Sequence, residues 1–172
     1  MATNANRETL IDYLRDAYAM EQQALSIIDR QLQRLEHYPQ LSQGLQRHRA
    51  ETESQAERLE ACLHRLGADT SAIKTGVAKM AVNMQALMNT FASDEVMKDM
   101  ISNYSFEAYE IVNYKILAAT AREVGETEIE RVATEILREE EAMLSWVDQQ
   151  IPVVTSQYLA REANHDQRAA KR

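Results

Sequence analysis

The chain has 172 residues, enough for one domain with its own hydrophobic core, and a formal net charge of −8. An acidic chain is a poor partner for nucleic acid or for an anionic membrane surface, so we expect it to bind neither. Because it has only 4 Gly and 2 Pro and is rich in helix-forming residues, the composition predicts an all-α fold. The single Cys and the lack of an apolar signal segment or membrane-length apolar run predict a cytoplasmic protein.

The first half of the chain predicts two long helices that form a hairpin. Residues 1–6 are expected to be disordered, and apolar residues spaced by three and four predict a first helix over about 7–36. Pro39 suits the first turn of a second helix over 39–66, which Gly67 is expected to end. Because the link between them is short, the two helices are expected to be antiparallel.

The segment after Gly67 predicts a long connection that contains a helix of its own. Its apolar residues recur at helical spacing, and we interpret them as core filler: Ile73, Val77, Met80, Met84, Leu87, Met88 and Phe91. A third helix is then predicted over about 93–124, where Gly125 ends it.

The last part of the chain predicts a fourth helix followed by less regular structure. Thr127 opens a capping box at the start of a helix over about 127–150. Pro152 is expected to bend or stop this helix. A short C-terminal helix over about 153–163 and a flexible polar tail over 164–172 are expected to follow.

Residues 7–163 are therefore expected to form a single domain made of two helical hairpins and the connection between them. A connection of this length can return the chain from one end of a bundle to the other. One long crossover is typical of ferritin-like antiparallel four-helix bundles, which is the architecture we predict. An array of five helices is the alternative.

Three carboxylates stand where the helical spacing predicts buried apolar residues. Glu21 lies between Ala17 and Ala24 on the apolar face of the first helix, and Glu107 and Glu140 hold similar places in the third and fourth. Burying unpaired carboxylates costs several kcal/mol, so these acids must share a positive partner, be protonated or lie on an exposed face. All three lie near the middle of their helices, which favours one shared site.

The inner face of the third helix is predicted from its apolar spacing to contain Met97, Met100, Ile101, Tyr104, Ala108 and Ile111. Glu107 lies within this stripe. Glu110 lies at its edge, one helical turn further along the chain.

The second helix is polar at the same depth, with His48, Thr52 and Gln55 on one face and Glu51 at its border. In dimetal carboxylate bundles, two helices each supply one Glu, and the other two each supply a Glu-x-x-His pair. The acids of the first and third helices would fill the single-Glu positions.

Both histidines of that pattern are missing. Thr52-x-x-Gln55 and Glu140-x-x-Met143 stand where the two Glu-x-x-His pairs are expected. A thioether is a poor ligand for Fe(II) or Mn(II), so we do not expect Met143 to bind metal. Glu110 is a candidate replacement ligand, and the expected cofactor is two divalent ions, Fe in the first place and Mn as the alternative.

The polar residues also have other interpretations. Gln55 can act as a hydrogen-bond donor to a carboxylate, and His48 as a buried core histidine or as a residue that orients Glu21 or Glu51. Glu51 and Glu110 can lie on a solvated edge instead of in the site.

Four strings follow one another over about residues 8–160: LRDAYAMEQQA, HRAETESQAERLE, FEAYEIVNY and ILREEEAMLSWV. In order and spacing they resemble the YciE/YciF family of bacterial stress proteins, and the YciE branch most closely. The resemblance implies a rubrerythrin-like bundle of the ferritin superfamily, a di-iron site and assembly as a dimer. By matching strings, it implies a set of metal-site residues: Glu21, Glu51, Gln55, Glu107, Glu110 and Glu140.

We therefore expect a cytoplasmic homodimer that binds two Fe or Mn ions and reduces peroxide or oxidises Fe(II) with peroxide or O2 during stress. The alternative is a non-enzymatic helical interaction protein built on a degenerate dimetal scaffold. The two missing histidines favour this alternative.

Overall fold

The computed structural model describes residues 4–70 and 95–169, with side chains up to residue 163. Within these residues the chain is helical and contains no strand, as the composition predicted. No helix in this part is both long and apolar enough to cross a membrane. The helices are α1 (Asn4–Leu32), α2 (Pro39–Arg65), α4 (Glu95–Val124) and α5 (Thr127–Ala169).

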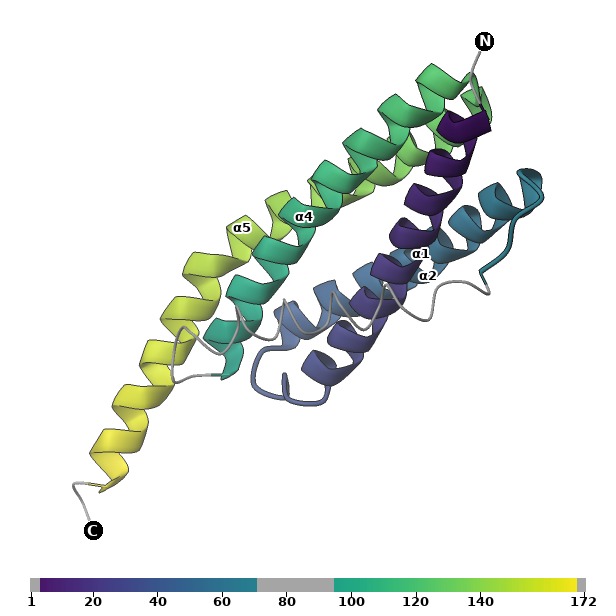
Figure 1. Ribbon diagram of the computed structural model, residues 1–172. Coiled ribbons are helices and arrows are strands. Elements are labelled where there is room, and N and C mark those ends of the chain that lie inside the picture. The colour runs from purple at the N-terminus through teal and green to yellow at the C-terminus, as the bar shows by residue number, and fades with distance from the viewer. Residues whose placement is uncertain (1–3, 71–94, 170–172) are drawn as a thin grey trace.

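The helices form two antiparallel hairpins that pack against each other as a four-helix bundle (Figure 1). α1 pairs with α2, and α4 pairs with α5. Between the hairpins, α1 packs on α4 and α2 packs on α5, so that α1 and α5 lie on one diagonal and α2 and α4 on the other. The predicted all-α bundle is confirmed.

The connection between the hairpins joins opposite ends of the bundle. Arg65 at the end of α2 pairs with Glu126 just beyond the end of α4, at 3.5 Å. Arg34, which follows α1, pairs with Glu95 in the first turn of α4, at 3.0 Å. α2 therefore ends at one end of the bundle and α4 begins at the other, as expected for one long crossover. The helix predicted within 71–91 lies outside the described residues.

Most helix boundaries have simple local causes. Pro39 occupies the first turn of α2, where its missing N–H costs nothing. Gly67 and Gly125 follow α2 and α4 with φ of 72° and 84°, a left-handed conformation that favours glycine. At the N-terminus the prediction was wrong, because α1 already begins at Asn4; it ends at Leu32, earlier than expected.

The separate C-terminal helix is also a wrong prediction, because α5 continues through Pro152 as far as Ala169. Pro152 lies on an exposed face, where solvent can hydrate the carbonyl group that proline leaves without a donor. Beyond the proline, Val154 is buried in the core, and the Arg161 guanidinium lies 5.5 Å from the centre of the Tyr38 ring. These tertiary contacts hold the last turns in place. Residues 164–169, predicted as part of a flexible tail, are helical in their backbone.

α4 is rotated about its axis relative to the prediction. Ile101 and Tyr104, predicted to face the core, are 44% and 40% exposed, whereas Phe106 and Glu110 are buried. The cause is that α4 carries apolar side chains on its outer face as well as its inner face. Apolar spacing alone therefore does not select the buried face of this helix.

The hydrophobic core consists of two clusters with a polar layer between them. On α2 the polar residues lie between Leu45 of one cluster and Leu59 of the other, and on α5 between Met143 and Ile136. The buried side chains of this layer are Glu21, His48, Thr52, Gln55, Glu107, Glu110 and Glu140. The core thus places a group of acids in the middle of the bundle.

Candidate metal centre

The polar layer brings a histidine and three glutamates into one compact cluster, defined here as His48, Glu107, Glu110 and Glu140. Each residue offers a ligand atom, and these atoms all lie within 4.8 Å of one another. The closest pair of opposite charges is His48 Nε2 and Glu107 Oε1, at 3.2 Å. Carboxylate oxygens with one imidazole nitrogen form a donor set that suits Fe, Mn or Zn.

The carboxylates of this layer have more acceptor atoms than donors to satisfy them. Among the described residues, neither oxygen of Glu110 has a hydrogen-bond partner, although its side chain is buried. One oxygen of each of Glu21, Glu107 and Glu140 is also buried without a partner. Unpartnered buried carboxylates are costly, and a cation bound in the cluster would give Glu107, Glu110 and Glu140 a partner, so the residues present fit a metal ion.

Burial makes these acids weak. It raises the pKa of Glu140 to about 10 and that of Glu21 to about 8, and it raises the pKa of Glu110 well above its ordinary range. Neighbouring carboxylates add to the rise at Glu110 and Glu140. The metal-free layer therefore holds protons, and a divalent cation must displace them to bind.

His48 is held by acids on two sides. Burial by itself lowers the pKa of His48, but the Glu107 carboxylate and other nearby acids outweigh burial, so that the pKa lies well above its usual value. On the inner side its Nε2 faces Glu107, and on the outer side its Nδ1 lies 3.8 Å from Glu51 Oε2. A carboxylate behind a histidine fixes the ring orientation and raises its basicity as a ligand.

Two hydrogen bonds position the acids next to the cluster. The Tyr114 hydroxyl of α4 donates to Glu21 Oε1 of α1. The Gln55 amide of α2 donates to Glu140 Oε1 at 2.5 Å and to Glu139 Oε2 at 3.0 Å. These bonds tie α4 to α1 and α2 to α5 at the depth of the cluster.

The six metal-site residues predicted from the sequence do not all lie in the polar layer. Five of the six are buried in the polar layer: Glu21, Gln55, Glu107, Glu110 and Glu140. The sixth, Glu51, has 55% of its side chain exposed and reaches the layer only through His48. Thr52, which stands in place of a ligand acid, donates its hydroxyl hydrogen bond to the His48 carbonyl oxygen within its own helix.

The sequence interpretation gave too little weight to His48 and did not include Tyr114 among the predicted site residues. His48 lies one helical turn before Thr52, on the same face, so its spacing already placed it at the site. Tyr114 lies two turns after Glu107, again on the same face. In both cases the signal was helical spacing relative to another residue of the polar layer, rather than membership of a Glu-x-x-His pair.

The chain is similar in fold to the solved structures of three proteins. A protein from Xanthomonas campestris pv. campestris is 31% identical with a TM-score of 0.77, and the match covers 92% of this chain and 99% of the other. The bacterioferritin of Desulfovibrio desulfuricans, which has a diiron site, is 22% identical with a TM-score of 0.73, over 93% and 91% of the two chains. The stress protein YciF of Escherichia coli is 22% identical with a TM-score of 0.66, over 87% and 94%.

The similarity to bacterioferritin extends over nearly the whole chain, which makes the fold a ferritin-like four-helix bundle. A protein-family model matches residues 5–160, and this range contains all four ligand-bearing residues of the cluster. The chain therefore belongs to the family described as "Domain of unknown function (DUF892)".

Proposed function

We propose that this protein is a ferritin-like carboxylate protein that binds divalent metal ions in its polar layer, Fe in the first place and Mn as the alternative. One observation carries the proposal: Glu110 is buried with neither oxygen hydrogen-bonded, within 4.8 Å of ligand atoms from His48, Glu107 and Glu140. Such an arrangement is costly without a cation and favourable with one.

The donor set supports two ions held by shared carboxylates. His48, Glu107, Glu110 and Glu140 would hold one ion. Glu21 would help to hold a second ion together with the shared acids. Its charge interacts with that of Glu107, and its second oxygen has no partner among the described residues. Bridging carboxylates reduce the repulsion between two cations, which is how dimetal bundles accommodate a pair.

The chemistry that we propose is oxidation of Fe(II) by peroxide or O2 during bacterial stress. An Fe(II) pair supplies the two electrons that reduction of peroxide to water requires. Similarity to the stress protein YciF, and to a bacterioferritin with a diiron site, supports this function. We further propose that the chain belongs to the YciE branch of its family and acts in the cytoplasm.

The test of this activity is stopped-flow oxidation of Fe(II) after anaerobic loading of metal-free protein. We expect peroxide to oxidise the bound Fe(II) faster than Fe(II) in buffer, and Glu107→Ala to remove the difference. Glu53→Gln changes an exposed acid that pairs with Arg49 on α2 and serves as the control. Equal rates for the unmodified protein and for buffer would contradict the activity, although not metal binding itself.

A non-enzymatic role on the same scaffold is the second candidate, and Thr52 and Gln55 favour it. Neither residue supplies a carboxylate or imidazole where helix 2 of a dimetal bundle is expected to do so. Gln55 instead donates a hydrogen bond to Glu140, which partly stabilises the acid without metal. In that case, removal of metal would leave the melting temperature unchanged.

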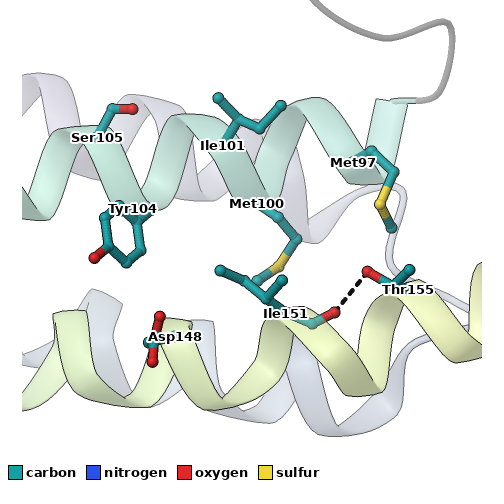
Figure 2. Close-up of a pocket in the computed structure, with 8 residues that line it drawn as sticks. All are labelled: Met97, Met100, Ile101, Tyr104, Ser105, Asp148, Ile151 and Thr155. Carbon is teal, nitrogen blue, oxygen red and sulfur yellow. Dashed lines mark hydrogen bonds between the residues drawn. The ribbon is translucent and has the colours of Figure 1, made fainter.

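We also propose a homodimer, formed through the outer face of α4. This face carries five large exposed apolar side chains, between 40% and 54% exposed: Ile101, Tyr104, Tyr109, Val112 and Ile116. At about 1.5 Å per residue, the stripe is about 22 Å long. Next to it is a groove of about 360 Å³, in which Met100 and Tyr104 of α4 face Ile151 and Asp148 of α5 (Figure 2). A contiguous exposed apolar surface of this kind is typical of a protein interface.

A further inference from the structure

We propose that the groove between α2 and α5 is the route by which divalent cations reach the buried cluster, with Glu51 and Glu139 as the acids that they meet first. The proposal rests on the metal binding proposed above and adds the path of uptake. The groove has a volume of about 380 Å³ and is lined on the α2 side by His48 and Glu51 and on the α5 side by Glu139, Ala142 and Trp146. His48 is both a lining residue of the groove and a member of the cluster.

Two polar chains of side chains lead from the groove into the cluster. In the first, Glu51 lies 3.8 Å from His48 Nδ1, and His48 Nε2 lies 3.2 Å from Glu107. In the second, the Gln55 amide donates hydrogen bonds both to Glu139 and to Glu140, at 3.0 and 2.5 Å. Each chain connects an acid on the groove to an acid of the cluster through one intermediate side chain, His48 in the first and Gln55 in the second.

Two other cavities among the described residues do not provide such a path. A cavity between α1, α2 and α4 touches His48 and Glu107, but it holds only about 10 Å³, close to the minimum for a single water molecule. The groove of Figure 2 has no cluster residue in its lining. The two hydrophobic clusters close the ends of the bundle around the polar layer. Of these three cavities, the α2–α5 groove is the large one that has a ligand residue in its lining.

The charges on the groove are mixed rather than purely acidic. Arg47 and Arg138 line it together with Glu51 and Glu139, and His48 adds a positive charge while it is protonated. Within the described residues, Glu139 pairs with Arg58 at 2.5 Å, and neither Arg47 nor Arg138 has an ion pair. The two arginines should therefore slow the approach of cations, and neutralising them should speed it.

The sequence provides a reporter in the groove itself, because Trp146 is the single tryptophan of the chain and lines the groove. The experiment follows quenching of Trp146 fluorescence when metal-free protein is mixed with Co²⁺ in a stopped-flow instrument. Ala142→Phe places a large side chain in the groove. Ala160→Phe makes the same change at an exposed position further along α5 and serves as the matched control.

We expect Ala142→Phe to slow Co²⁺ uptake about tenfold, while the amount of Co²⁺ bound at equilibrium stays the same. Ala160→Phe should behave like the unmodified protein. Glu51→Gln, at an exposed position where the fold is not at risk, should slow uptake by about two- to threefold, and Arg47→Gln should speed it by a similar factor. The uptake rates of Glu51→Gln and Arg47→Gln provide a test even if Ala142→Phe fails to fold.

Two results would refute the route, provided that the variants still bind Co²⁺ at equilibrium. The first is Co²⁺ uptake by Ala142→Phe at the rate of the unmodified protein. The second is an unchanged uptake rate in both Glu51→Gln and Arg47→Gln. The proposed metal binding would survive that result. If the unmodified protein binds no Co²⁺ at equilibrium, the proposed function and the route are both wrong. Equilibrium capacity and uptake rate therefore separate the two failures.

Discussion

Glu110 is the residue at which burial and hydrogen bonding conflict most strongly, because both of its oxygens are buried and unpartnered. Glu110→Gln should stabilise the metal-free protein by about 1–3 kcal/mol at the high pH where Glu110 ionises, since it removes a carboxylate that has no compensating partner. The same change should weaken Mn²⁺ binding by at least about 10–100-fold, the loss typical of removing even an outer partner of a metal ligand. Thermal unfolding with and without chelator, and calorimetric titration with Mn²⁺, measure the two effects.

The matched control for this variant is Glu53→Gln, which changes an exposed acid on α2. It should change neither stability nor affinity by a measurable amount, because exposed ion pairs contribute little. A Glu110→Gln protein that keeps full Mn²⁺ affinity would show that Glu110 is not a ligand.

The raised pKa values of the layer give stability a definite dependence on pH. Glu21 and Glu140, with pKa values of about 8 and about 10 in the folded chain, keep protons that the unfolded chain releases near its ordinary value of 4.5. Stability of the metal-free protein should therefore fall as pH rises above about 5, until these groups ionise in the folded state as well. The raised pKa of His48 acts in the same direction, because its contribution is lost as pH rises.

Melting temperatures of chelator-treated protein between about pH 6 and pH 9 test this dependence. We expect a steady fall, a shallower fall in Glu140→Gln, and a reversal of the trend when Mn²⁺ is saturating, because metal binding is favoured as protons leave. A metal-free melting temperature that rises over this range would mean that the acids are already ionised and stabilised.

The acids of the site could be predicted because each interrupts an apolar helical stripe, as Glu21, Glu107 and Glu140 do. His48 could not be assigned in the same way, since a histidine is compatible with both a core and a ligand position. The place of Glu51 could not be predicted from its closeness in sequence to Thr52. Adjacent residues on a helix point about 100° apart. The Glu51 side chain therefore lies on the groove and not in the cluster.

At the scale of helices, the lengths and ends of α2 and α4 could be predicted from Pro39, Gly67 and Gly125, because the causes are local. The orientation of α4 could not, because it is apolar on two faces and only its neighbours decide which face is buried. The passage of α5 through Pro152 could not be predicted either. It depends on the tertiary contacts of Val154 and Arg161 rather than on local propensity.

Gly44 of α2 lies close against the Trp146 indole of α5, and both residues line the groove. A β-carbon at Gly44 would lie 2.0 Å from Trp146 Cζ2. Gly44→Ala should therefore destabilise the protein, since an overpacking cost of about 1–3 kcal/mol exceeds the gain of about 1 kcal/mol in helix propensity. Trp146 fluorescence should change at the same time, because the indole has to move.

The control for this contact is the same substitution in a Trp146→Leu background, where the clash is removed. There Gly44→Ala should stabilise the protein instead, by helix propensity alone. The sign of the change in unfolding free energy, measured by denaturant titration in both backgrounds, is the decisive quantity. Destabilisation of equal size in both would show that Trp146 does not lie against Gly44.

At the scale of the whole molecule, the apolar outer face of α4 predicts self-association. Val112 is 54% exposed and lies in the middle of this face. A charged side chain at this position should be harmless in a monomer but should weaken an interface. Val112→Asp is expected to convert a dimer into a monomer in sedimentation velocity without lowering the melting point of the monomer. Val153→Asp, at a 38% exposed valine on α5, should leave the dimer intact. A monomeric unmodified protein would contradict the proposed homodimer.

Elemental analysis of protein purified without added metal shows whether the polar layer of this ferritin-like bundle is a metal site, as we propose. We expect about two Fe or Mn ions per chain, as in dimetal carboxylate bundles, and almost none in Glu107→Ala. A metal-free protein that takes up neither Fe(II) nor Mn²⁺ on reconstitution, and in which Glu21→Ala and Glu140→Ala only increase stability, would contradict it.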